Sequence, residues 1–187
     1  MAWALILSVA PGVLSADSIK FDFRDSKKVN NVVFLMDAPL ESINGTATGV
    51  SGTVSFDPAK PAATTGKIVL ATSSLHVDNP LMKKHMLDEG WMHVSKFPTI
   101  EFVAVKMTNV KTSGTTIIAT IAGKLTVKGI TKKVSVPVRL TYLKGMLIKR
   151  NRVPGDLLVL RCDFTIKRSD YGINAGPETK RKEQMKG

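Results

Sequence analysis

The sequence predicts an all-β fold, an antiparallel sandwich or barrel with one short helix. Apolar and polar residues alternate with a period of two over most of the chain after Asp17. The alternating runs are short and are separated by Gly, Pro and Asn residues. Only the segment Pro80–Glu89 has helical spacing instead. Many short strands with a single helix are typical of sandwiches and barrels.

The first strands follow from local patterns. Ile19, Phe21 and Phe23 alternate with charged residues, which predicts a half-buried strand over 19–24. Val32–Met36 is short, branched and aromatic, which predicts a second strand. Asn44-Gly45 is a strong turn signal and also opens a formal glycosylation sequon. We therefore expect a turn there.

The remaining elements follow in order. The expected strands are Gly49–Phe56, Lys67–Ser74, Ile100–Val105, Thr116–Val127, Val134–Thr141 and Leu157–Lys167. The helix is expected to begin at Pro80 with Asn79 as its cap and to end at Gly90. Val32–Met36 and Leu157–Leu160 are apolar on both faces, so a helix, a loop or a second subunit of a homodimer should cover them.

Composition is consistent with one folded domain and leaves the partner open. The chain has 187 residues, 43% of them hydrophobic, and a net charge of +12. The positive charge either keeps a sheet protein soluble or favours peripheral contact with an anionic membrane surface. No RNP-like motif, zinc-knuckle spacing or recognition helix is present, so no nucleic-acid partner is predicted.

The first sixteen residues contain no charged side chain and end in small residues at Ser15 and Ala16. The apolar run is too short to span a bilayer and resembles the h-region of a signal peptide with cleavage after Ala16. The alternative, a buried N-terminal strand, is disfavoured by Pro11-Gly12. The expected location is therefore periplasmic or secreted.

The sequence offers no recognisable catalytic or metal motif. Gly49–Thr53 is similar to a nucleophile elbow, but Thr53 stands where the second glycine is needed. His76, His85 and His93 lack the spacing of a helix-borne metal pair. Cys162 is the only cysteine and lies in an apolar run, which predicts a small hydrophobic role. No enzyme activity, metal or cofactor is predicted; a site at the barrel mouth using His85 or His93 is the minor alternative.

Five motifs resemble one known family. Gly52-Thr53-Val54-Ser55-Phe56-Asp57-Pro58 is similar to the Gly-x-Ile-x-Phe-Asp-Pro element of the YceI-like polyisoprenoid-binding family. The other matching segments are His85–Trp91, Phe97–Phe102, Gly123–Lys132 and Arg168–Ile173, in the family's order. The resemblance implies a lipocalin-like antiparallel barrel of eight strands with a helix near one side. It also implies a long isoprenoid or fatty chain, such as a quinone precursor, held in the lumen for carriage or storage.

Strand parity predicts which residues contact that chain. The expected lumen residues are Phe34, Met36, Val54, Phe56, Ile68, Leu70, Ile100, Phe102, Leu125, Val127, Val136, Val138, Leu160 and Phe164. The expected mouth residues are Leu81, Met82, Met86 and Trp91. A structural or interaction module of the periplasm is the alternative to lipid binding.

Other motif residues have physical interpretations. Gly123 and Gly129 permit tight bends or turns. Arg168 either pairs with an acidic group such as Asp170 at the barrel end or meets a ligand head group.

Two segments depart from the family pattern. Met82-Lys83 replace the family's Arg-Asp before the helix His, which makes the mouth more apolar and basic. Residues 174–187 form a basic tail without apolar alternation. We therefore expect the domain at 17–173 to lack its closing strand, as in a fragment.

Overall fold

The computed structural model describes residues 18–38 and 41–173. The strands within these ranges are β1 Ile19–Asp22, β2 Val32–Ala38, β3 Glu41–Ala47, β4 Val50–Phe56, β5 Thr65–Ala71, β6 Leu75–His76, β7 Thr99–Ser113, β8 Thr116–Val127, β9 Ile130–Leu143 and β10 Leu157–Cys162. The helices are α1 Pro80–Leu87 and α2 Leu147–Asn151. No helix in this part of the chain has the length and hydropathy of a membrane span.

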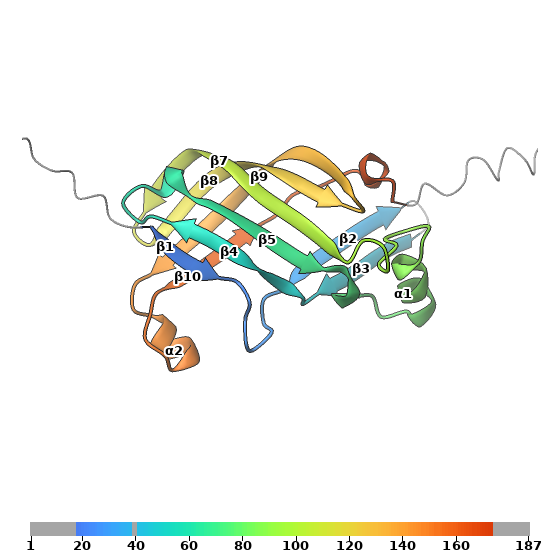
Figure 1. The fold of residues 1–187 in the computed structure, drawn as a ribbon, viewed down its shortest axis with the longest axis horizontal. Helices are drawn as coiled ribbons and strands as arrows, with labels where there is room; N and C mark the ends of the chain where they lie inside the picture. The colour runs from blue at the N-terminus through green and yellow to red at the C-terminus, as the bar shows by residue number, and fades with distance from the viewer. Residues whose placement is uncertain (1–17, 39–40, 174–187) are drawn as a thin grey trace, which may run out of the picture.

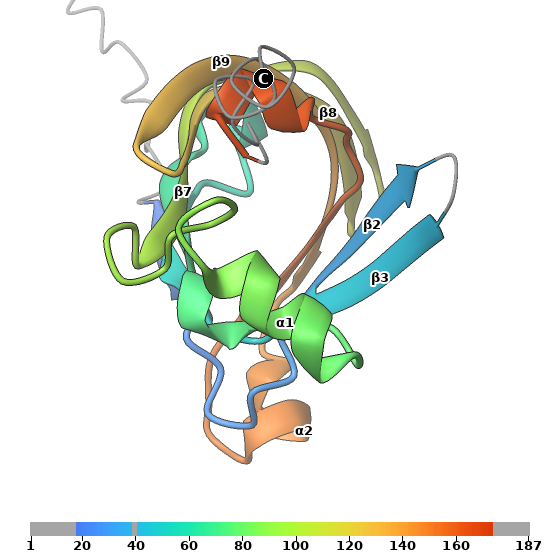
Figure 2. The same ribbon diagram turned by 90° about the vertical axis from the view of Figure 1, so that its right-hand side faces the viewer.

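The strands form a nearly closed antiparallel barrel, which confirms the predicted fold class (Figure 1). Seven strands make one sheet in the order β1-β4-β5-β7-β8-β9-β10, and a smaller sheet has the order β2-β3-β6. Within the described residues, β10, β1 and β2 each have a hydrogen-bonded neighbour on one side only. The barrel therefore has an unsealed seam, and the β2–β3 hairpin projects beside it (Figure 2).

A tight turn connects β8 to β9, and two bulges bend β7 along the barrel wall. Lys128 and Gly129 both have positive φ, 49° and 75°, and connect β8 to β9 with Val127 paired to Ile130. This two-residue turn matches the strand twist and confirms the prediction for Gly129. The register of β7 against β8 shifts twice, next to Ala104 and around Asn109, and such bulges increase local bending.

Side chains fill the barrel interior in two clusters. The α2-end cluster is built on Phe21, Phe56, Ile121, Val138, Leu140 and their neighbours. The α1-end cluster is built on Ala47, Leu75, Leu125, Val127, Tyr171 and their neighbours. Phe102 and Val134 pack against both clusters, so the apolar interior is continuous from one end to the other.

The turn predicted at Asn44-Gly45 is wrong. Both residues lie within β3, where Asn44 pairs with Leu35 and Gly45 with Phe34. Gly45 is used here because the ring of Phe34 occupies the space that a Cβ would need. The chain reverses instead between Ala38 and Glu41, which pair across the hairpin. Gly123 has a similar role in β8, where the Phe102 ring fills the corresponding space, so it permits close packing and not a turn.

The predicted helix is confirmed and a second one was missed. The side-chain oxygen of Asn79 accepts hydrogen bonds from the backbone N–H groups of Leu81 and Met82, both at 3.0 Å. No helix was predicted between Thr141 and Leu157, but this segment contains α2, which is followed by Arg152 in a left-handed conformation. α2 spans five residues, too few for an amphipathic period to be recognised.

Several strand boundaries differ from the prediction. β5 ends at Ala71 and a 3-10 turn, Thr72–Ser74, follows it. β7 extends to Ser113, beyond the predicted Val105, because its bulges interrupt the alternation without ending the pairing. β10 ends at Cys162 and not at Lys167, and Cys162 is exposed on this edge strand, so its expected core role is wrong. The predicted signal peptide and basic tail lie outside the described residues.

Candidate functional site

The candidate site is the apolar barrel interior together with its two ends. Twelve of the fourteen predicted lumen residues belong to the two interior clusters or pack against them. The α2-end cluster includes Val54, Phe56, Ile68, Val136, Val138 and Leu160, the α1-end cluster includes Phe34, Leu70, Ile100, Leu125 and Val127, and Phe102 is shared. Their inward placement follows from strand parity. Their contact with a ligand stays a prediction.

Two predicted lumen residues lie elsewhere. Met36 is half-buried near the tip of the β2–β3 hairpin and belongs to neither cluster. Phe164 is 41% exposed, so its predicted inward position is wrong. The pairing of β10 with β9 ends at Cys162 and Val138. Strand parity has no meaning beyond that point, which explains the error.

Of the four predicted mouth residues, two pack against the α1-end cluster and two do not. Met86 and Trp91 pack against the α1-end cluster. Leu81 is 61% exposed, and Met82 is half-buried but lies outside the cluster. Five residues of an α-helix turn through about 140° beyond a full turn, so Leu81 points away from the face that carries Met86. Leu81 therefore lies outside the cluster, and its contact with a lipid at the mouth stays a prediction.

Other interior residues were not predicted. They include Phe21 of β1, Met107 of β7, Ile117, Ala119 and Ile121 of β8, Leu140 of β9, Leu158 of β10, and Met92 and Tyr171 from loops. Those on strands share the alternation of the residues that were predicted. Met92 and Tyr171 lie outside any periodic segment, so periodicity could not have found them.

The α2 end combines an aromatic cluster with a polar pair. Phe21, Phe56 and Tyr142 pack with ring centroids 5.5 to 6.4 Å apart. The Tyr142 hydroxyl donates to Asp156 Oδ2 at 2.6 Å, and the Gly145 N–H donates to Asp156 Oδ1 at 2.7 Å. The hydrogen bond to Asp156, together with burial, raises the pKa of Tyr142 to about 12. The same bonds lower the pKa of Asp156 below its usual 3.8.

A hollow opens beside this pair. It has a volume of about 460 Å³, within the range of small-molecule sites. Ile19, Lys20, Phe21, Leu147, Gly155 and Asp156 line it.

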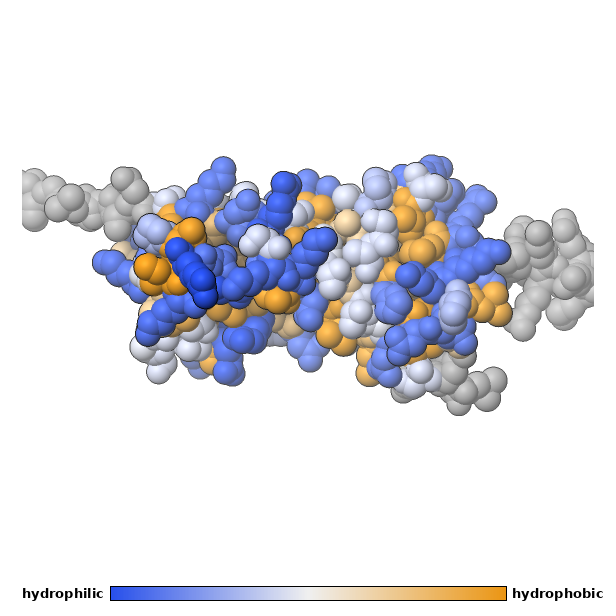
Figure 3. Space-filling model, turned by 90° about the horizontal axis from the view of Figure 1, so that it is seen from below, coloured by the Kyte–Doolittle hydropathy of each residue, from blue (hydrophilic) through white to orange (hydrophobic). Residues whose placement is uncertain are grey.

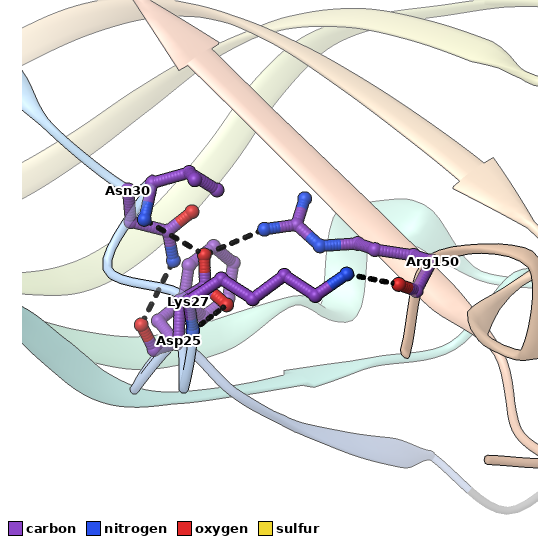
Figure 4. A network of polar contacts seen from close by, with 6 residues as sticks. Asp25, Lys27, Asn30 and Arg150 are labelled. Atoms are coloured by element: carbon purple, nitrogen blue, oxygen red, sulfur yellow. Dashed lines mark hydrogen bonds and ion pairs between the residues drawn. The ribbon is translucent and has the colours of Figure 1, made fainter. Parts of the chain in front are cut away.

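Polar contacts fasten α2 across this end of the barrel (Figure 4). Asp25, in the connection between β1 and β2, accepts from Arg150 Nη2 at 2.6 Å and from the N–H groups of Lys27 and Val29 at 3.1 Å. Lys27 Nζ donates to the Arg150 carbonyl at 2.5 Å. Burial opposes the ionisation of Asp25, but the two backbone N–H groups and Arg150 outweigh it, and the pKa of Asp25 is lowered.

The α1 end carries a cation without a complete set of partners. The guanidinium carbon of Arg168 lies 5.1 Å from the Trp91 ring centroid. Arg168 Nη1 is buried and has no hydrogen-bond partner among the described residues. The ion pairs of the described residues are Lys67–Glu101, Arg150–Asp25 and His76–Asp78, so the predicted pairing of Arg168 with Asp170 is not formed. Lys128 Nζ donates to the carbonyls of Glu89 and Gly172, both at 3.1 Å.

The remaining candidates do not form a reactive site in the described part of the chain. No group of three or more His, Cys, Asp or Glu side chains there could hold a metal ion. His85 is exposed on α1, and the His93 ring packs edge-on against Phe97. Ser51 lies in mid-strand, paired with Val69, and not on a strand-to-helix elbow. A smaller hollow of about 170 Å³ beside β2, β3 and β6 contains His76 and Asp78 but no third titratable group.

Comparison with known proteins shows which family this chain belongs to. The family model described as "YceI-like domain" matches residues 20–186. A "UPF0312 protein" of Pseudomonas putida is 36% identical over 137 residues, which cover 72% of this chain and 65% of that protein. A "UPF0312 protein" of Pseudomonas savastanoi pv. phaseolicola is 38% identical over 94 residues, 49% of this chain and 46% of that protein. The chain thus spans about half to two thirds of the length of these relatives.

Solved structures share the fold. Burkholderia cenocepacia BcnA has a TM-score of 0.58 at 23% identity, with 78% of this chain and 80% of that chain covered. A mutant CJ YCEI protein with a monobromobimane guest structure has a TM-score of 0.61 at 19% identity, with 85% and 88% covered. The matched family region includes residues 174–186, where the missing closing strand was predicted. That prediction stays a prediction, because the segment lies outside the described residues.

Proposed function

Because this chain belongs to the YceI-like domain family, whose members are known as polyisoprenoid-binding proteins, we propose that it binds a polyisoprenoid or another single long apolar chain inside its barrel. A quinone precursor or a fatty chain fits the same chemistry. One observation carries the proposal, the continuous apolar interior that Phe102 and Val134 connect from end to end. The family has a binding-protein fold, and the proposed role is carriage or storage in the cell envelope without catalysis.

Binding in a filled interior requires the barrel to open. Its unsealed seam gives a route, because β10 and the β1–β2 segment can separate without the loss of a strand ladder. Each buried methylene then contributes about 0.8 kcal/mol. Burial of a chain of sixteen carbons therefore contributes on the order of 10 kcal/mol to binding. The cost of displacing side chains from the interior reduces this free energy. Leu and Met side chains, such as Leu160 and Met86, can repack around tails of different shape.

The charge of the protein favours peripheral contact with a membrane. The net charge of +12 favours contact with anionic lipid head groups. Seen from the α2 side, hydrophilic side chains alternate with small apolar patches (Figure 3). Together with the N-terminal residues 1–16, this supports a periplasmic or secreted location as part of the proposal. The lipid is the ligand; no cofactor and no nucleic-acid partner is proposed.

A second candidate function is a non-catalytic interaction module, which one observation favours. Val33 and Leu35 on β2 are 70% and 66% exposed, on a strand whose outer edge is unpaired in the described structure. Such an edge can pair with the same strand of a second copy. Light scattering at micromolar concentration tests this, since a monomer that binds lipid would leave only the first function.

Two measurements test lipid binding. Protein purified from its native envelope is extracted with organic solvent, and mass spectrometry should find one long-chain lipid in near-stoichiometric amount. Separately, Trp3→Phe leaves Trp91 as the single tryptophan, at the edge of the α1-end cluster. Its emission should shift and saturate on titration with a prenyl alcohol. Recovery of no lipid, together with no saturable change, would reject the proposed function.

A further inference from the structure

We propose that Arg168 is the head-group residue of this site and that it selects single-chain lipids with an anionic oxygen head group, a carboxylate or a phosphate. The inference rests on the proposed function. It adds the orientation of the lipid, with the head at the α1 end and the tail directed into the barrel.

The guanidinium of Arg168 lies where an anionic partner would stabilise it. Its carbon lies over the Trp91 ring at 5.1 Å, and its Nη1 atom is buried without a hydrogen-bond partner in the described part of the chain. Arginine cannot lose its proton in a protein, so the charge remains when water is excluded. A buried donor without an acceptor is unfavourable, and more so when it is charged. A carboxylate or phosphate oxygen at Nη1 would remove this penalty.

The backbone around Arg168 holds the guanidinium at the end of the apolar interior. Arg168 begins a 3-10 turn, Arg168–Tyr171, whose last residue is 2% exposed within the α1-end cluster. The N–H of Ile173 returns to the Arg168 carbonyl at 3.1 Å. Lys128 connects this turn to the loop after α1 through its bonds to Gly172 and Glu89. Trp91, under the guanidinium, packs against the same cluster. A tail in the interior would therefore bring its head group close to Arg168.

The opposite end of the barrel is less suited to an anion. Its charged pair Asp25–Arg150 is already formed, and in the hollow there the Asp156 carboxylate offsets the charge of the Lys20 ammonium, so the lining carries no excess positive charge. Asn151 Oδ1 is also buried without a partner within residues 18–38 and 41–173, but an amide oxygen is a neutral acceptor and does not attract an anion. The polar groups of the two ends therefore favour one orientation of an acidic lipid.

Pairs of lipids with the same tail test the proposal. Geranylgeranyl phosphate is compared with geranylgeraniol, and palmitate with palmitamide, using Trp91 emission in the Trp3→Phe background. The two pairs distinguish a phosphate from a carboxylate preference. In at least one pair, the wild-type protein should bind the anionic lipid about tenfold or more tightly than the neutral lipid with the same tail. Arg168→Met should remove this preference and leave the affinity for the neutral probe within about threefold, since the tail contacts remain.

Lys96→Met is the matched control. Lys96 Nζ lies 5.6 Å from the Phe97 ring centroid, so it is also a cation over an aromatic ring in the region after α1, but it is exposed. Its removal changes the net charge by the same amount and should leave the preference intact. Arg168→Lys should retain part of the preference, because the positive charge stays but the paired N–H donors of the guanidinium are lost.

Three results would overturn the proposal. The first is equal binding of anionic and neutral probes by the wild type. The second is the same loss of preference in Lys96→Met as in Arg168→Met, which would indicate general attraction by the positive charge. The third, measured on the unmutated protein in case Arg168→Met does not fold, is a guanidinium NMR signal of Arg168 that palmitate and the phosphate leave unmoved. If no probe binds at all, the proposed function itself fails.

Discussion

The ring of Phe34 on β2 lies over Gly45 on β3, in the space that any larger residue would need for its Cβ. The same ring packs against the α1-end cluster and so connects the β2–β3 hairpin to the barrel interior. Gly45→Ala should therefore destabilise the protein by about 1–3 kcal/mol, as overpacking does elsewhere. Urea unfolding followed by circular dichroism measures the change.

A matched control and a rescue define this prediction. Gly90→Ala adds a methyl where no atom lies within 4 Å and should change stability by less than about 0.5 kcal/mol. Phe34→Leu combined with Gly45→Ala should recover part of the loss, because the smaller side chain leaves room for the methyl. Additive effects of the two substitutions would show that ring and glycine do not interact in this way.

The same pair shows where sequence reasoning succeeds and fails. Asn-Gly predicts a turn at Asn44-Gly45, but the tertiary contact of Phe34 determines the conformation, and no local pattern contains it. Lys128-Gly129 forms the predicted kind of turn because the register of β8 and β9 and the local preference agree.

The site was predictable to the extent that strand parity determines it. Residues in regular ladders, such as Leu125 and Val138, lie inside as expected. Phe164 does not, because the ladder ends before it. The position of Arg168 over Trp91 joins two irregular segments, so no periodicity relates the two residues.

The Asp25–Arg150 contact should make part of the stability depend on pH in the acid range. The pKa of Asp25 is lower in the folded than in the unfolded chain, where it is near 3.8. The folded state therefore binds fewer protons, and this contribution is present above pH 4 and is lost as the pH falls through the lowered pKa. Asp25→Asn should lower stability at neutral pH and flatten its dependence below about pH 4. Thermal unfolding between neutral and acid pH tests this.

Asp78→Asn is the control for that series, since Asp78 is fully exposed and has only a 3.5 Å contact with His76. An acid dependence in Asp25→Asn as steep as in the wild type would assign the effect to other carboxylates.

Tyr142 should titrate far above its ordinary pKa of 10. Its hydrogen bond to Asp156 and its burial raise the pKa to about 12. The folded state therefore holds this proton more tightly, and its contribution to stability is present below pH 10 and is lost as the pH rises toward 12. Asp156→Asn removes the carboxylate and should bring the Tyr142 pKa down toward 10, as seen by tyrosinate absorbance. Tyr142→Phe identifies the signal, because Tyr171 is the only other tyrosine. An unchanged titration in Asp156→Asn would contradict the assignment.

Phe102 should control the space available to a tail. Its ring packs against both interior clusters and over Gly123. Phe102→Ala should cost about 2–4 kcal/mol of unfolding free energy and leave a cavity at the centre of the barrel. Under the proposed function, that cavity should increase the affinity for prenyl alcohols, because fewer side-chain atoms must be displaced. Val103→Ala, on the exposed face of the same strand, should change neither quantity by much. Weaker binding in Phe102→Ala would contradict this prediction and would mean that the lost contact between ring and lipid outweighs the space gained.

The seam should be the part of the barrel that responds most to lipid. β8 has a paired neighbour on each side, whereas β2 and β10 have one each within the described structure. Amides at an open edge exchange through small local openings, so β2 and β10 should exchange with deuterium faster than β8 in the lipid-free protein. A tail that enters through the seam and then holds it together should slow exchange in β2 and β10 and leave β8 almost unchanged. Protection confined to the α2 hollow around Leu147 would instead place the tail outside the barrel, in the groove beside Lys20 and Asp156.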